Sequence, residues 1–219
     1  MSDATVPSTS SPADPMPQIY LRPPSHSAEG SASTLSLPIH TFVPPVDFLR
    51  GNWHVTHSSL PMWKKAQNVS ITYTVLSLDS TACPTFDNLV EYQSLGASDD
   101  NPKKTVKGVE APRHGVEGAW RWRGKGWLMI ASSDWEVLGY GRSNAVGVGG
   151  PVAMEERRED DWCVTYFAKT LFTPSGIDVY CRQKQGLDEA VLGEIKEALK
   201  DCGEEVHKLG QALFEVKRA

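Results

Sequence analysis

The stretch Val69-Ser70-Ile71-Thr72-Tyr73-Thr74-Val75 decides the fold class of this chain. Apolar residues alternate along it with small polar ones, with a period of two. Because successive side chains of a β-strand point to opposite faces, this pattern predicts a half-buried strand with one apolar face.

Short runs of β-branched and aromatic residues continue on both sides of this strand. From Asp47 onward they alternate with clusters of Gly, Pro, Asn and Asp, which is typical of an all-β barrel or sandwich. Thr173-Pro174-Ser175-Gly176 predicts a hairpin turn between the last two long runs. Besides the strand over residues 69–75, we expect strands over residues 52–59, 88–95, 104–111, 118–123, 127–132, 136–141, 162–171 and 177–182.

One amphipathic helix follows the strands. Apolar residues from Leu187 to Cys202 recur at helical spacing, and Asp188 and Glu189 lie near the expected helix start. Gly203 is placed to end the helix in a left-handed cap. We therefore expect a helix over residues 187–203 that packs on the strands, and a short closing strand over residues 213–216.

The N-terminal part of the chain has a different composition. Residues 1–45 contain nine of the 15 prolines and much serine, but no tryptophan or cysteine. Such a stretch buries too little apolar area to offset its ordering entropy. The sequence therefore predicts a disordered tail over residues 1–45, of which residues 35–43 are apolar enough to dock, and one folded domain over residues 46–219.

Charge and motifs exclude several classes of protein. The net charge is −5 with both signs interspersed, so we expect no nucleic-acid partner. No apolar run reaches the length of a membrane span, and no secretory signal pattern is present, so we expect a cytoplasmic location. Cys83, Cys163, Cys181 and Cys202 lack metal-ligand spacing, which predicts free thiols, no metal and no cofactor.

Three motifs, taken in this order, resemble the lipocalins. Gly51-Asn52-Trp53, preceded by a predicted helical turn, is similar to the Gly-x-Trp opening of the first lipocalin strand. Ser133-Asp134-Trp135 resembles the central Thr-Asp-Tyr motif of that family. Arg182, at the end of the last long strand and just before the helix, is similar to the family's last-strand arginine. The resemblance spans roughly residues 46–216.

This resemblance implies an antiparallel up-and-down β-barrel with one C-terminal helix. In it, Trp53 plugs one end of the barrel, Arg182 lies across the indole, and Gly51 and Asp134 are structural residues of the same closed end. The long stretch over residues 162–169 is more similar to the lipocalin domain of violaxanthin de-epoxidase than to secreted lipocalins. A closed barrel of about eight strands leaves an interior able to hold one small ligand.

The candidate ligand site follows from which side chains point inward. Trp120 and Trp122 share one face of their strand while Arg121 and Arg123 point away from it. The same aromatic residues serve equally well as plain core packing, so this alternative stays open. We predict ligand-facing side chains at Trp63, Tyr73, Tyr92, Trp120, Trp122, Met129, Tyr140, Tyr166 and His57, with Trp63 on a loop at the barrel mouth.

Three functions remain open from the sequence. The first is a binding protein for a small hydrophobic molecule such as a lipid, an isoprenoid or a polyketide, with most of the affinity from apolar burial. The second is an isomerase or cyclase on the same barrel, with His57, Glu91, Tyr92 and Tyr166 as acid–base candidates. The third is an interaction module whose barrel is filled. The oligomeric state cannot be read from the sequence.

Overall fold

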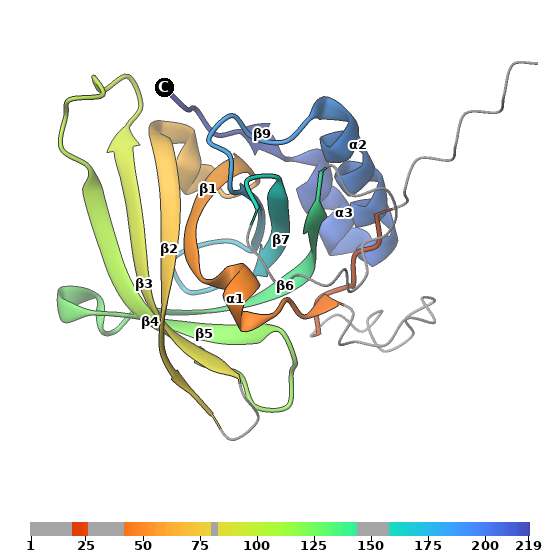
Figure 1. Ribbon diagram of the computed structural model, residues 1–219, viewed down its shortest axis with the longest axis horizontal. Helices are drawn as coiled ribbons and strands as arrows, with labels where there is room; N and C mark the ends of the chain where they lie inside the picture. Colours follow the sequence, from red (N-terminus) through yellow and green to blue (C-terminus); the bar gives the residue numbers. More distant parts are fainter. Residues whose placement is uncertain (1–18, 26–41, 80–82, 144–157) are drawn as a thin grey trace, which may run out of the picture.

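The computed structural model describes residues 19–25, 42–79, 83–143 and 158–219, and its centre is a closed antiparallel β-barrel. Each strand pairs with the next along the chain, and β1 pairs with both β2 and β8, which closes the barrel (Figure 1). The eight strands are β1 (Gly51–Ser58), β2 (Ala66–Leu78), β3 (Pro84–Ser94), β4 (Lys104–Pro112), β5 (Ala119–Gly124), β6 (Ser132–Arg142), β7 (Asp161–Phe167) and β8 (Gly176–Cys181). The predicted up-and-down barrel is confirmed.

Two helices lie together on one outer side of this barrel, shown in blue in Figure 1. They are α2 (Glu189–Ala198) and α3 (Glu204–Gln211), joined by the single turn η5 (Leu199–Cys202). A second hydrophobic cluster lies beneath them, separate from the barrel interior, and includes Trp162, Ile177 and Ile195. Strands β7 and β8 are therefore buried on both faces. After α3, the short strand β9 (Phe214–Glu215) pairs with β1.

Two elements differ from the sequence prediction. Residues 127–131 do not form a strand, because Gly126 takes a positive φ of 62° and begins the single turn η4 (Gly126–Leu128) that connects β5 to β6, which starts at Ser132. The helix predicted over residues 187–203 is followed by a second one, α3. Gly203 separates them with φ 98° and ψ 163°, an extended glycine conformation rather than the predicted left-handed cap.

A short segment of the expected N-terminal tail lies on the barrel. The Leu21 side chain is buried in the outer cluster, and the Arg22 backbone N–H donates to the Leu138 carbonyl of β6 at 2.8 Å. The guanidinium of Arg22 is buried and forms an ion pair of 3.1 Å with Glu136. The prediction of a disordered tail is therefore wrong for residues 19–25. Of the segment predicted to dock, the described Phe42 is buried. Residues 1–18 and 26–41 lie outside the described residues.

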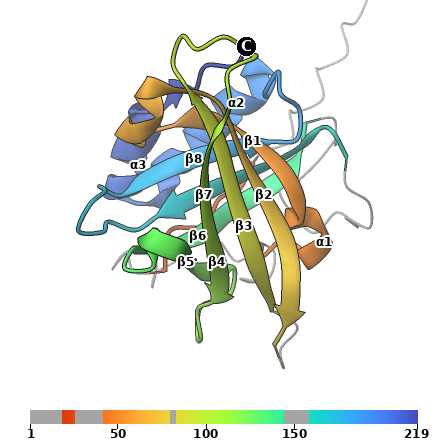
Figure 2. The same ribbon diagram turned by 90° about the vertical axis from the view of Figure 1, so that its left-hand side faces the viewer.

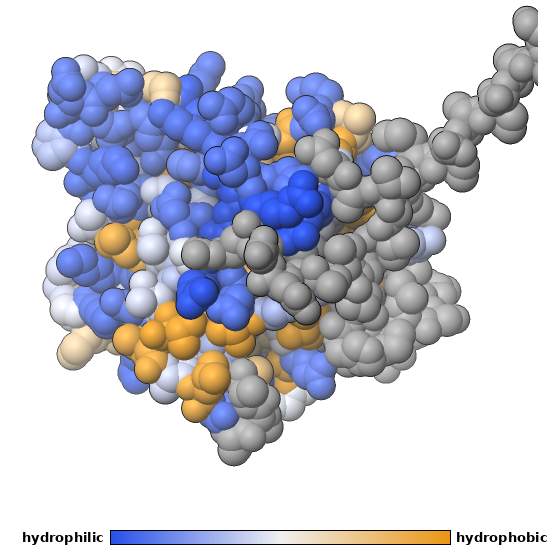
Figure 3. Space-filling view, in the orientation of Figure 1, coloured by the Kyte–Doolittle hydropathy of each residue, from blue (hydrophilic) through white to orange (hydrophobic). Residues whose placement is uncertain are grey.

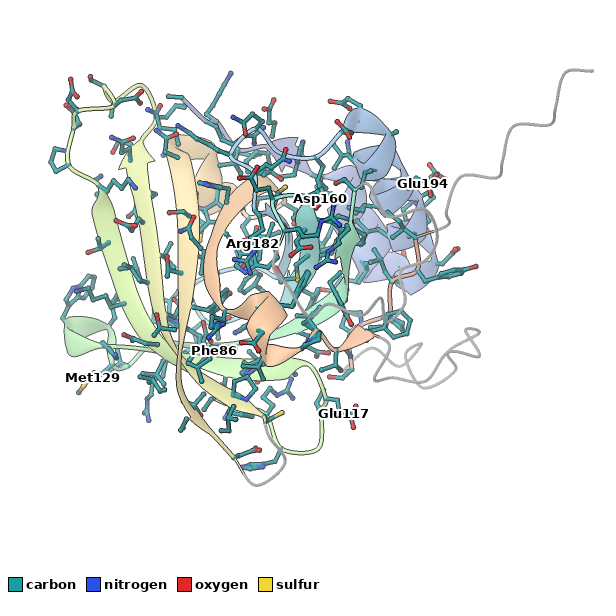
Figure 4. All side chains as sticks on the ribbon, viewed as in Figure 1. Phe86, Glu117, Met129, Asp160, Arg182 and Glu194 are labelled. Atoms are coloured by element: carbon teal, nitrogen blue, oxygen red, sulfur yellow. The ribbon has the colours of Figure 1, made fainter. Side chains whose placement is uncertain are left out.

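The end of the barrel where the chain enters β1 is closed. Helix α1 (Val46–Leu49) covers it, and the buried Trp53 indole donates to the Leu49 carbonyl at 2.8 Å. The guanidinium of Arg182 lies 3.6 Å from the centre of the Trp53 ring (Figure 4). It also donates to the carbonyl oxygens of Phe48, Arg50 and Asn52. One side chain thus ties α1, β1 and β8 together.

We expect Arg182→Ala to lower the free energy of unfolding by about 2–3 kcal/mol, because a cation–π contact and charge-assisted hydrogen bonds are lost together. Arg182→Lys should fall between wild type and Arg182→Ala, since an ammonium keeps the charge but not the planar set of donors. Urea unfolding followed by tryptophan fluorescence measures the change. Lys107→Ala on exposed β4 surface is the control, and equal stability of both alanine variants would contradict this role.

Candidate ligand cavity

A cavity of about 250 Å³ lies inside the barrel, toward the end opposite α1. The four connections at that end are η3 (Pro61–Lys65) between β1 and β2, residues 95–103 between β3 and β4, the η4 segment between β5 and β6, and residues 168–175 between β7 and β8. Figure 2 shows β2, β3 and β4 side by side on one wall of the barrel. The lining side chains include Leu60, Met62, Trp63, Ile71, Tyr73, Asn88, Val90, Tyr92, Val106, Glu110, Trp122, Phe167, Phe172, Asp178 and Tyr180.

Aromatic and aliphatic side chains form most of the wall. Trp63 on η3 meets Tyr92 edge-on, with 5.8 Å between ring centres. Trp122 on β5 packs closely against Gly108 of β4, where a Cβ atom would overlap the indole. A glycine at position 108 is therefore required for Trp122 to reach this position.

Glu110 on β4 is the first of two buried carboxyl groups in the cavity lining. Its Oε2 accepts a hydrogen bond of 2.7 Å from the Trp135 indole, and Oε1 accepts none in the described part of the chain. Burial raises the pKa of Glu110 from 4.5 to about 8, opposed only by the Trp135 hydrogen bond. The carboxyl is therefore largely protonated at neutral pH.

Asp178 on β8 is a second buried carboxyl group in the lining. Its Oδ1 accepts from the Ser58 hydroxyl at 2.5 Å, and its Oδ2 accepts from the Trp63 indole at 3.4 Å. Burial raises the pKa of Asp178 to about 7, and the two hydrogen bonds oppose this shift. Asp178 therefore links the mouth element η3 to the cavity floor.

Three further polar side chains complete the floor. Tyr73 on β2 and Tyr180 on β8 are buried, and desolvation is the main reason that the pKa of each lies well above 10. Tyr73 also interacts electrostatically with Tyr180 and Glu110, which places the three groups close together. The buried Asn88 Oδ1 has no hydrogen-bond partner among the described residues.

Four of the nine predicted ligand-facing residues line this cavity: Trp63, Tyr73, Tyr92 and Trp122. Two others, Trp120 and Tyr140, point into the barrel but fill its closed half. Trp120 stacks on Trp135 at 4.8 Å and donates to the Pro84 carbonyl, while Tyr140 packs against Phe48 at 4.9 Å.

The remaining three predicted residues lie away from the cavity. Met129 is 62% exposed beside η4 and points outward in Figure 4. Tyr166 lies in the outer cluster, where its hydroxyl donates to Glu205 of α3 at 3.2 Å. His57 does not share the inward face of Trp53 and Val55, because a β-bulge between Val55 and His57 reverses the alternation and points Ser58 inward instead.

Two other expected positions also differ. Glu91, an acid–base candidate, forms a long ion pair of 3.9 Å with Lys103 and does not line the cavity. The expected structural residue Asp134 does bond an arginine, Arg121, at 2.7 Å, but it lies near the start of β6 rather than near the closed end. The contact with Arg121 holds the pKa of Asp134 below its usual value.

Sequence reasoning missed both buried carboxyl groups. On β8, Asp178 alternates with the apolar Ile177 and Val179, a pattern that normally indicates a solvent-facing carboxylate. Here the apolar residues face the helices and the polar ones face the interior, so both faces are buried. Glu110 follows the inward positions Val106 and Gly108 on β4, and only the register of the barrel shows that it points inward.

Large apolar side chains are exposed around the mouth. Phe172, 76% exposed, lines the cavity and borders solvent, and so does Met62 on η3. On the face shown in Figure 3, hydrophobic residues gather instead at the lower edge, near the end of β2, where Leu76 and Leu78 are exposed. The exposed apolar residues beside the mouth are Met62, Trp127, Met129, Ile130, Leu171 and Phe172.

Neither a metal-binding group of side chains nor a membrane-spanning helix is present in the described ranges. No group of three His, Cys, Asp or Glu side chains there could hold a metal ion. In the same residues no helix is long and apolar enough to cross a membrane.

The barrel, its end closed by Trp53 and Arg182 and its interior cavity together define the lipocalin fold. Apocrustacyanin C1 aligns with a TM-score of 0.52 over 83% of each chain at 11% identity. H1 crustacyanin from the lobster Homarus americanus aligns with a TM-score of 0.52 over 84% of this chain and 87% of its own, at 10% identity. The sequence matches no protein-family model and no curated protein. The predicted lipocalin fold is confirmed by structure.

The buried carboxyl groups predict an unusual pH dependence of stability. The folded state binds the Glu110 and Asp178 protons more tightly than the unfolded state does. With respect to these groups, stability is therefore greatest below about pH 4, where both carboxyls are protonated in the folded and the unfolded state, and it is lost as pH rises toward the folded-state pKa values of about 8 and about 7. Between pH 5 and pH 8, Glu110 should lower the free energy of unfolding of the wild-type protein by on the order of 1–3 kcal/mol. We expect this decrease to be absent in Glu110→Gln.

Urea unfolding at pH 5, 6, 7 and 8 measures this slope. Glu91→Gln removes a carboxylate outside the cavity and should leave the slope unchanged. Parallel curves for wild type and Glu110→Gln would show that Glu110 is ionised in the folded protein.

Proposed function

We propose that this protein binds a small hydrophobic molecule in the barrel cavity. The observation that carries the proposal is the cavity itself, which is lined mostly by apolar and aromatic side chains and bordered by the exposed Phe172 and Met62 at the mouth. Ligand pockets are usually of this kind, with a few polar groups that fix orientation.

The size of the cavity limits the ligand. A volume of about 250 Å³ lies just below the roughly 300–1,000 Å³ typical of small-molecule sites. A compact lipid, isoprenoid or polyketide-like molecule fits this volume better than a long-chain one. The apolar rim of Trp127, Ile130, Leu171 and Phe172 gives such a ligand a surface to contact before it enters.

An enzyme on the same barrel is the second candidate. It is favoured by Glu110 and Asp178, whose pKa values of about 8 and 7 suit proton transfer near neutral pH. Of the acid–base residues predicted from sequence, only Tyr92 lines the cavity. Turnover of a bound ligand that Glu110→Gln abolishes, with binding retained, would favour the enzyme over the binding protein.

Native mass spectrometry of the purified chain tests the first proposal, followed by extraction and identification of any bound molecule. Tryptophan quenching by compact isoprenoids and aromatic probes should saturate, because Trp63 and Trp122 line the cavity. Val90→Phe fills the cavity and should weaken binding about tenfold or more, through loss of apolar contact and steric overlap.

Leu76→Phe is the matched control, because it adds the same ring at an exposed position on β2 outside the cavity. It should bind as wild type does. If Val90→Phe also bound as tightly as wild type, the ligand would lie outside the barrel and this proposal would be wrong.

A further inference from the structure

The cavity lining is rich in hydrogen-bond acceptors and contains no base. Two carboxyl groups lie in it, yet none of the lining residues is Lys, Arg or His. The hydrogen bonds to these carboxyl groups come from neutral donors, Ser58, Trp63 and Trp135. Burying acidic groups without a cation is costly, so proteins usually pair them.

Two buried side-chain atoms of the same lining have no hydrogen-bond partner among the described residues, Asn88 Oδ1 and the Tyr180 hydroxyl oxygen. The hydroxyl can donate or accept, whereas the amide oxygen can only accept, so Asn88 points to a ligand that donates hydrogen bonds. Asn88 is only 3% exposed and lines the cavity, and its Oδ1 has no partner in the described ranges. Asn88 pairs in register with Gly108 of β4, two residues before Glu110, so the two side chains lie diagonally on neighbouring strands. Buried polar atoms are nearly always hydrogen-bonded, which leaves the cavity as the source of the missing donor.

Glu110 is better placed than Asp178 to meet such a donor. Both oxygens of Asp178 already accept a hydrogen bond, whereas Glu110 accepts only through Oε2. Trp122 is the register partner of Glu110 on β5, and Tyr73 lies close by. A cation between these rings would gain cation–π attraction in addition to the carboxylate.

We propose that the cavity binds a small amine with an apolar body, such as an arylalkylamine, as its ammonium ion. The ammonium donates to Glu110 and to Asn88 Oδ1, and the apolar body lies against the aromatic wall. This inference rests on the proposed function, since it names the ligand class of the same cavity.

Binding then releases one proton. An empty cavity holds Glu110 protonated, and the incoming ammonium replaces that proton, which passes to solvent. The carboxyl becomes a carboxylate and the amine keeps its charge. The titratable group that interacts with Glu110 is Tyr73 on β2. The groups that interact in turn with Tyr73 and Tyr180 are also acids, namely Cys163 on β7 and Asp178 on β8.

Isothermal titration of the full chain with 2-phenylethylamine and 2-phenylethanol tests the proposal, because the two probes share a body and differ in the charged group. At pH 7.5 we expect the amine to bind about tenfold tighter or more. Glu110→Gln should remove this preference while the alcohol still binds. Glu91→Gln, which removes an acid outside the cavity, should keep the preference.

Proton release gives a second readout that needs no variant. Titrations at pH 6.5 in two buffers of different ionisation enthalpy should show a proton leaving on amine binding and none on alcohol binding. Equal affinity for both probes, no proton release, or an amine preference that survives in Glu110→Gln would overturn the inference. If an apolar probe still saturated the cavity, the proposed function would stand; if no probe bound at all, both would fail.

Discussion

The stack of Trp120, Trp135 and Tyr73 is the constraint on which the interior of this barrel depends. Trp135 lies between the other two rings, at 4.8 Å from Trp120 and 5.7 Å from Tyr73. On the α1 side of this stack the barrel is filled by Trp53, Phe48 and Tyr140. On the mouth side lies the cavity. The stack also holds the cavity's chemistry in place, because the Trp135 indole donates to Glu110 and the Tyr73 hydroxyl lies near it.

The outer layer explains how strands β6 to β8 accept buried residues on both faces. Helices α2 and α3 cover one part, and the segment of residues 19–25 covers β6 next to them. Gly139 of β6 leaves the space that Leu21 fills, since a Cβ atom there would overlap the leucine. Arg22 then forms an ion pair with Glu136, which is another buried acid. Glu110 and Asp178 lack any such partner in the cavity lining, which sets them apart chemically.

Local patterns in the sequence predict the barrel but not the side chains of the cavity floor. Three elements depend on neighbouring residues only: the alternation in β2, the Gly51-Asn52-Trp53 motif of β1 and the helical spacing after Leu187. All three form, although α2 ends at Ala198, earlier than predicted. The inward direction of Asp178 depends on helices that pack from elsewhere in the chain. The outward direction of His57 depends on one bulge in β1. Such features arise from the pairing and packing of distant segments, which the periodicity of a single strand does not reveal.

Glu110 differs from the structural carboxyl groups of this protein in having no cationic partner in the cavity lining. Glu136 and Asp161 are equally buried, and each is paired with an arginine, Arg22 and Arg142 respectively. The chain therefore neutralises buried acids with cations in these two places, next to the outer layer. At Glu110 an aliphatic residue of similar volume would be less costly to bury than an acid with one neutral donor. Glu110 faces an apolar cavity and lowers the stability of the fold as pH rises. Its presence is therefore better explained by a ligand that enters the cavity than by a role in the fold.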